Sequence, residues 1–150
     1  MDINDQMATI FGGIFVLANK LQILGDRVND YMSMKQWILI AAITKSEKES
    51  LNISELAEVI GTSYQNVKKM ALILEKQGFL ALKKNPRDAR AVLISVTEHC
   101  REFFSQREDI EKEFLISVFK GIDKKTISGL YDGLLCLHEN IKCLERAKAK

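Results

Sequence analysis

The chain has 150 residues, of which 47% are hydrophobic and 28% charged, with one proline and eight glycines. These values predict one soluble globular domain that is long enough to bury its own core. The formal net charge of +2 excludes a histone-like polycation and an acidic solvating tail. The charge is nevertheless uneven, because residues 62–90 hold seven basic and two acidic side chains. A basic block therefore lies within an otherwise slightly acidic chain.

The three cysteines, Cys100, Cys136 and Cys143, form no C-x-x-C motif. An odd count without that motif indicates neither a disulfide framework nor a four-ligand zinc site, so we expect buried, inert thiols in a reducing cytoplasm. The longest apolar run, Met7–Ala18, follows acidic residues and is too short to span a bilayer. We therefore expect no export signal and no membrane-spanning helix.

Apolar residues between Ile3 and Val28 recur at alternating steps of four and three, which predicts one long helix with a broad apolar face. Such a face packs either within a single-chain bundle or against another subunit. Gly12 and Gly13 lie in this helix and indicate either a close backbone approach or a kink. Ser33–Thr44 predicts a second, mostly buried helix.

Two short helices follow, joined through Gly61. Asn52 and Glu55 have the spacing of a capping box and open the first of them. The second runs to about Gln77 and opens either on a capping box from Thr62 to Gln65 or on Ser63 with Asn66 as its cap. Both helices are amphipathic, and the second carries its lysines on the polar side.

Two β-like runs, Phe79–Lys83 and Ala91–Val96, are joined by the turn-forming segment Lys84–Arg90 and predict a basic hairpin. Helical periodicity resumes at Glu98 and breaks at Gly121, which predicts two further long helices. The expected fold class is therefore mostly α with a small β-hairpin.

Two short helices joined at a glycine, the second with outward polar and basic residues, form the pattern of a helix-turn-helix. The exposed N-terminal side chains of such a second helix reach base edges in the major groove. On this helix the candidate DNA-binding residues are Ser63, Tyr64, Gln65, Asn66, Lys68 and Lys69. The hairpin adds Lys84, Arg87 and Arg90, which suit phosphates or the minor groove. A helix-turn-helix with a basic hairpin is a winged helix.

The candidate DNA-binding residues also have interpretations that involve no DNA. A lysine cluster alone is usually a solvated face. The ring of Tyr64 packs beneath the hairpin in one alternative, and Asp88 with Arg90 forms only a turn-stabilising pair in another. His99 and His138 belong to no cluster with metal-ligand spacing, so we expect no metal and no cofactor. The sequence contains no Gly-rich phosphate loop, nucleophile elbow or H-E-x-x-H motif, so we expect no enzyme.

Residues Asn52–Thr97 resemble the winged-helix DNA-binding region of MarR-type transcriptional regulators. The residues that carry the resemblance are Leu56-Ala57, Gly61, the run Leu74–Phe79, and Asp88-Ala89-Arg90 in the hairpin. Gln36-Trp37 and Val96-Thr97 also fit. The long flanking helices are similar to the dimerisation arms of that family, so the resemblance extends over most of the chain.

The resemblance implies one domain over residues 1–150, with a winged-helix lobe at 33–97 and dimerisation helices at 1–30 and 98–147. It implies a cytoplasmic homodimer that binds pseudo-palindromic double-stranded promoter DNA. We expect a repressor that is released by a small-molecule effector, for which a small aromatic compound is the family's usual type. The alternative is a winged-helix protein-interaction module without DNA binding.

The resemblance also implies roles in the wing. Asp88 would hold Arg90 by a salt bridge while Arg90 enters the minor groove. Ala89 stands where the family more often has arginine, which removes one cation. We therefore expect Arg87 and Lys84 to act as supplementary contacts. Some relatives sense peroxides through a cysteine in the first helix, and this first helix has none.

Overall fold

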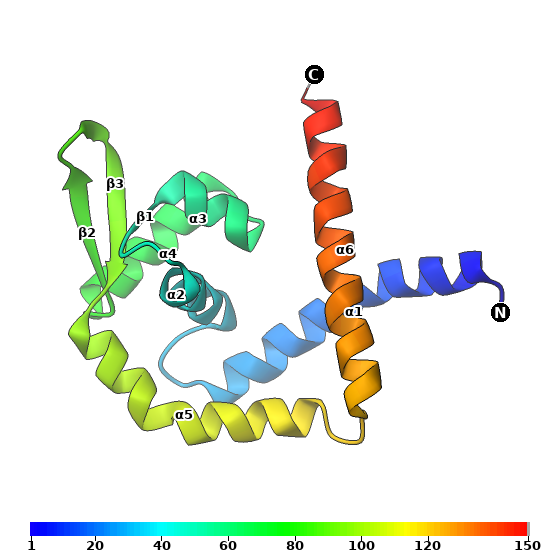
Figure 1. The fold of residues 1–150 in the computed structure, drawn as a ribbon. Coiled ribbons are helices and arrows are strands. Elements are labelled where there is room, and N and C mark those ends of the chain that lie inside the picture. The colour runs from blue at the N-terminus through cyan, green and yellow to red at the C-terminus, as the bar shows by residue number, and fades with distance from the viewer. Residues whose placement is uncertain (150) are drawn as a thin grey trace. The chain divides into compact units, whose positions relative to one another are not determined.

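The computed structural model describes residues 1–149, apart from the side chain of residue 89. The chain divides into two compact units, Met1–Ser105 and Gln106–Lys150. The described residues are mostly helical, with one small antiparallel sheet (Figure 1). The predicted fold class is thus confirmed.

The long N-terminal helix α1 (Ile3–Val28) begins where the apolar periodicity begins. Its first turn is fixed by a capping box, in which the Asp2 carboxylate accepts the Asp5 N–H at 2.8 Å and Asp5 accepts the Asp2 N–H at 3.4 Å. Close packing on the next helix occurs at Gly25, where an added Cβ would collide with the side chain of Met34. A larger residue at position 25 would therefore displace the end of the flexible Met34 side chain.

The apolar stripe of α1 is exposed within the chain, with Ile10 at 55% and Leu17 at 59% accessibility. A Cβ added at Gly12 or Gly13 would meet no described atom within 4 Å, so the close approach considered for these glycines does not occur within the described chain. Among residues 1–149, α1 is the one helix long and apolar enough to cross a membrane. Core helices of soluble proteins can have the same length and hydropathy. The expectation of no membrane-spanning helix was based on Met7–Ala18, which is only part of α1.

The core of the first unit is built by three helices, α2 (Met34–Lys45), α3 (Ile53–Ile60) and α4 (Tyr64–Lys76). Each contributes at least one completely buried aliphatic side chain, namely Leu39, Leu56, Val67 and Leu74. Their apolar positions follow the helical period, so one face of each helix points inward. Trp37 is only half-buried and packs against the edge of this core.

Three antiparallel strands close the core in the order β1-β3-β2. Strand β1 (Leu51–Asn52) pairs with Leu93 and Ile94 of the central strand β3 (Asp88–Val96). Strand β2 (Leu80–Asn85) pairs with the other side of β3 and forms the second edge of the sheet. Ile94 in β3 is completely buried and lies opposite both Leu51 and Leu82. Strand β1 was not predicted, because a two-residue strand has no measurable periodicity.

The hairpin is longer than predicted. The sequence assigns residues 84–90 to a connecting loop, whereas β2 continues to Asn85 and β3 starts at Asp88. Pro86 and Arg87 alone form the turn between the strands. The predicted loop at residues 84–90 was therefore too long, because Lys84, Asn85 and Asp88 pair between the two strands.

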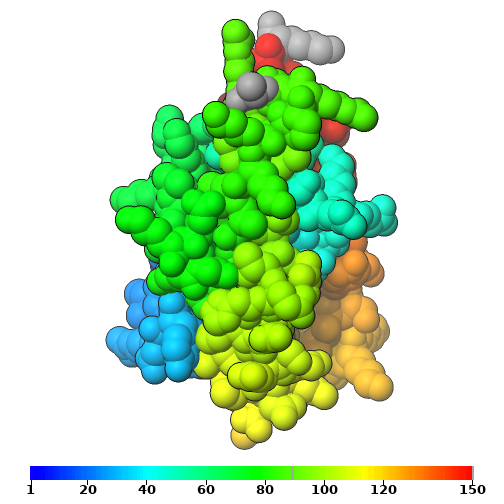
Figure 2. Space-filling model, turned by 90° about the vertical axis from the view of Figure 1, so that its left-hand side faces the viewer, coloured from blue at the N-terminus to red at the C-terminus, as the bar shows by residue number. Residues whose placement is uncertain are grey.

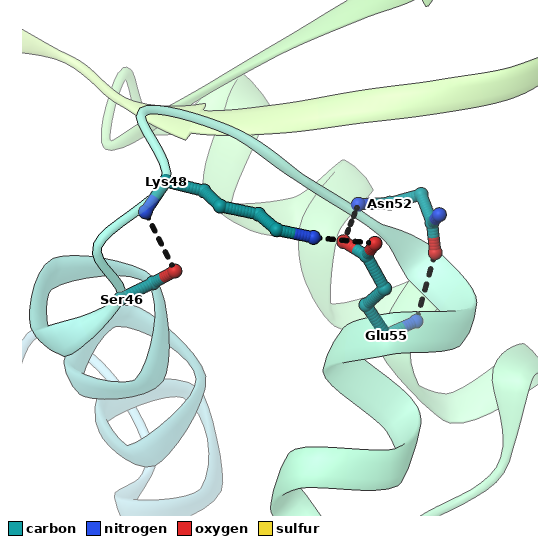
Figure 3. A network of polar contacts seen from close by, with 4 residues as sticks. All are labelled: Ser46, Lys48, Asn52 and Glu55. Carbon is teal, nitrogen blue, oxygen red and sulfur yellow. Dashed lines mark hydrogen bonds and ion pairs between the residues drawn. The ribbon is translucent and has the colours of Figure 1, made fainter.

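A polar network fixes the segment between α2 and α3 (Figure 3). Asn52 caps α3 by accepting the Glu55 N–H at 2.8 Å, and the Glu55 carboxylate accepts the Asn52 N–H at 3.2 Å, so the predicted capping box is confirmed. The same carboxylate pairs with the Lys48 ammonium at 3.0 Å. Lys48 in turn donates its backbone N–H to the Ser46 hydroxyl at 3.1 Å.

The hydrogen bond from Lys48 is the main cause that lowers the pKa of Glu55 below its ordinary value of 4.5. A carboxylate with a lowered folded-state pKa stabilises the fold above its unfolded pKa. This stabilisation is lost as the pH falls through the lowered pKa. The network therefore supports the start of α3 at neutral pH and weakens in acid.

Helix α5 (Glu98–Val118) starts directly after β3 and runs from the first unit into the second. An aromatic cluster holds its first turns within the first unit: Phe103 lies 5.0 Å from Phe79 and 5.2 Å from Tyr31 between ring centroids. In the second unit, helix α6 (Lys124–Lys148) is capped by Asp123, which accepts the Thr126 N–H at 2.8 Å. The order of elements predicted from the sequence is confirmed, with β1 as an addition.

Candidate nucleic-acid interface

Helices α3 and α4 form the predicted helix-turn-helix. Gly61 ends α3 in the left-handed conformation with φ of 68°, which a residue without a Cβ adopts readily. The Thr62 N–H then bonds to the carbonyl of Ala57 at 3.0 Å and closes the turn. Only Thr62 and Ser63 separate Gly61 from Tyr64, the first residue of α4, so the turn is as short as a helix-turn-helix requires.

The cap of α4 is Ser63, whose hydroxyl accepts the Asn66 N–H at 3.2 Å. Of the two alternatives from the sequence, Ser63 with Asn66 is confirmed and the Thr62–Gln65 box is wrong. The Asn66 side-chain amide also donates to the Thr62 hydroxyl at 3.1 Å. The first turn of α4 is thus held by its own polar side chains.

The faces of α4 divide as predicted. Val67, Ala71 and Leu74 are buried, whereas every candidate DNA-binding residue of the helix is exposed. Tyr64 is 43% exposed, so it lies outside the core. The structure thereby brings together on one helix end the exposed residues Ser63, Tyr64, Gln65, Asn66, Lys68 and Lys69.

The end of the hairpin has an irregular register. Asn85 lies opposite Asp88, but the next pair is Lys84 with Val92, so residues 89–91 of β3 have no partner on β2. This bulge contains Arg90. Bulges of this kind bend a strand and change the direction of a side chain.

Two side chains hold this end of the hairpin in place. Asn85 Oδ1 accepts the Arg87 N–H at 3.0 Å, and Asp88 Oδ1 accepts the Arg90 N–H at 3.0 Å. Among the described side chains, the Arg90 guanidinium forms no ion pair with Asp88. The observed Asp88–Arg90 contact is therefore the backbone hydrogen bond that stabilises the turn, and the described residues include no salt bridge between the two side chains.

The cations of the candidate interface are not neutralised by neighbouring carboxylates. Within residues 1–149, none of Lys68, Lys69, Lys84, Arg87 and Arg90 lies within ion-pair distance of an acidic side chain, and all five are exposed. Figure 2 shows the green atoms of this part of the chain at the surface, with side chains that project at its upper end. Exposed cations without acidic neighbours suit a polyanionic partner.

The histidines and cysteines of the described chain do not come together as a metal or redox centre. No group of three or more potential metal ligands occurs among the described residues. Cys100 is buried, and burial raises the pKa of its thiol to about 11, so it is a poor nucleophile near neutral pH. Cys136 and Cys143 are exposed within their unit, contrary to the expectation of buried thiols, because α6 leaves its apolar side open.

Comparison with known proteins finds similar sequences and similar folds. Residues 32–92, which comprise α2 through the first part of β3, match the model of the MarR family. Over this segment the chain is similar to the MarR family. An uncharacterised HTH-type transcriptional regulator, YfiV of Bacillus subtilis (strain 168), is 26% identical over 120 residues, which are 78% of this chain and 70% of that protein.

Solved MarR structures share the fold across nearly the whole chain. A MarR/EmrR family transcriptional regulator from Acinetobacter sp. ADP1 is 19% identical, with a TM-score of 0.78 over 95% of this chain and 99% of that one. A mutant MarR from E. coli complexed with operator DNA is 17% identical, with a TM-score of 0.72 over 91% and 99%. The MarR winged-helix fold with flanking helices is thereby established for this chain.

Proposed function

We propose that this protein is a MarR-type, sequence-specific regulator that binds double-stranded promoter DNA. The observation that carries the proposal is the exposed, polar N-terminal end of α4, in the same winged helix as a hairpin whose exposed cations form no ion pair among the described residues. Gln65 and Asn66 are suited to adenine edges, and Lys68 and Lys69 to guanine or phosphate. The complex of the similar E. coli protein with operator DNA supports this assignment.

The hairpin supplies the second set of contacts in the proposal. Arg90 enters the minor groove, with Arg87 and Lys84 as supplementary contacts to phosphates. Because Asp88 already holds the backbone of Arg90, it orders the turn before DNA binds. Within one winged helix, α4 and the hairpin would then contact adjacent grooves of the same duplex.

The proposed active form is a cytoplasmic homodimer, with residues 33–97 as the DNA-binding lobe and residues 1–30 and 98–147 as dimerisation helices of a single domain. The apolar stripes of α1 and of α6, including Leu134 at 58% and Leu144 at 64% exposed, support this assignment. Stripes of that width are stable in water only when another surface covers them. Two copies would read the halves of a pseudo-palindrome.

We assign a repressor role with release by a small-molecule effector, an aromatic compound by analogy with the family. Release is a linkage effect: a ligand that favours a dimer with mis-spaced α4 helices lowers DNA affinity by its differential affinity for that state. No catalytic role is assigned, in keeping with a family of transcriptional regulators.

Binding of the purified protein to duplex DNA at several salt concentrations tests the proposed function. We expect the logarithm of the affinity to fall steeply with the logarithm of the salt concentration, with a slope that reflects the number of phosphate contacts. Fluorescence anisotropy with a labelled duplex measures it. Negligible affinity even at low salt would instead favour the alternative, a winged-helix module that binds proteins.

A further inference from the structure

The joint between α4 and β2 is very short. Helix α4 ends at Lys76 and β2 begins at Leu80. Gly78 has φ of 81°, and the Phe79 N–H bonds to the Leu74 carbonyl at 2.9 Å. The direction of the hairpin relative to α4 is therefore decided by a few contacts around this joint.

The inner side of the joint is fixed by Thr97, which follows β3. Its hydroxyl donates to the Gly78 carbonyl at 2.5 Å, and its N–H bonds to the Phe79 carbonyl at 3.1 Å. Phe79 and Leu80 are both buried beside it. These contacts hold the base of β2 against the core but leave its outer edge unsupported.

The outer edge is held by Glu75, on the last turn of α4. Strand β2 is the edge of the sheet, and the Leu82 N–H bonds to Glu75 Oε2 at 3.2 Å. An edge N–H is otherwise left to water. This bond spans seven residues and directly connects the DNA-facing helix to the hairpin.

We propose that Glu75 is a positioning residue that sets the angle of the hairpin to α4, so that both contact one duplex together. The inference rests on the proposed DNA-binding function. Strand β2 runs three residues beyond Leu82 to Asn85, which is about 10 Å, before the turn at Pro86 and Arg87. A rotation of the strand at Leu82 therefore shifts the hairpin end, and the arginine beyond it, relative to α4.

The proposal predicts an effect opposite to that of simple electrostatics. Glu75 is a negative charge in the basic segment, so its removal alone should strengthen DNA binding. Glu75→Gln removes the charge and keeps a carbonyl acceptor for the Leu82 N–H, whereas Glu75→Ala removes both. We expect the Gln variant to bind DNA at least as tightly as the wild type, and the Ala variant to bind about threefold to tenfold more weakly.

Hydrogen exchange of the Leu82 amide in the free protein tests the Leu82–Glu75 hydrogen bond without DNA. We expect the Leu82 amide to exchange about threefold to tenfold faster in Glu75→Ala and at an almost unchanged rate in Glu75→Gln. Glu58→Ala, which removes an exposed carboxylate from α3, is the matched control and is expected to leave both measurements near wild type. An unchanged Leu82 rate in the Ala variant would overturn the proposal, whether or not the wild type binds DNA.

A double-mutant cycle separates positioning from a general loss of stability. In an Arg90→Ala background, where the hairpin contributes less, Glu75→Ala is expected to cost less DNA affinity than it does alone. Equal losses in both backgrounds, or an Ala variant that binds as tightly as the Gln variant, would contradict the positioning role. If the wild type binds no duplex, the proposed function fails, and the exchange rates still decide whether Glu75 holds β2.

Discussion

Leu17→Glu is expected to convert the protein from a dimer to a monomer and to lower its affinity for operator-like DNA at least about a hundredfold. Leu17 lies in the α1 stripe and is 59% exposed in the single chain. An unpaired carboxylate in an apolar interface costs several kcal/mol. Loss of the dimer also removes the simultaneous binding of two half-sites. Sedimentation velocity measures the first effect and anisotropy with labelled DNA the second.

The matched control is Asn19→Glu, which adds the same charge to α1 about 200° further around the helix. It is expected to remain a dimer with nearly unchanged affinity. A wild type that sediments as a 17.0 kDa monomer at micromolar concentration would contradict the assignment of the stripe. A Leu17→Glu variant that stays dimeric would place the interface elsewhere.

Arg90→Ala is expected to weaken DNA binding by about 1–3 kcal/mol and to reduce the salt slope by about 1. The reason is its position in the bulge, where Asp88 holds its backbone and its guanidinium has no ion pair with that carboxylate. Lys148→Ala removes the same charge from the end of α6 and is expected to have little effect. Affinity measured over a range of salt concentrations compares the two variants.

Equal losses for Arg90→Ala and Lys148→Ala would contradict a specific wing contact. Such a result would indicate diffuse attraction between the duplex and the whole basic surface instead. The near-neutral net charge of +2 argues against strong diffuse attraction. Specific binding must therefore depend on where the exposed cations are placed.

The helices could be predicted because each begins and ends with a local signal. The Asn52 capping box, the left-handed Gly61 and the 3.6-residue period all involve contacts between near neighbours in sequence. The choice between Thr62 and Ser63 as the cap of α4 remained open, since both offer a hydroxyl at a suitable spacing. Only the observed bond to the Asn66 N–H decided it.

The strand ends and the register of the hairpin could not be predicted from the sequence pattern. Turn-forming residues at 84–90 suggested a loop, but the register shift at Lys84–Asn85 depends on contacts across two strands. The same limit applies to Glu75, because its bond to Leu82 crosses the end of a helix and follows no period. The exposure of Cys136 likewise depends on what covers α6, which periodicity alone does not reveal.

Selection of bound duplexes from a random pool tests the central claim most directly. The account predicts recovery of an inverted repeat whose half-sites lie about one helical turn apart, because two α4 helices of a symmetric dimer enter successive major grooves. That result would demonstrate sequence-specific reading and dimer symmetry together. A selected pool with no enriched sequence, or with a single unrepeated half-site, would contradict the claim.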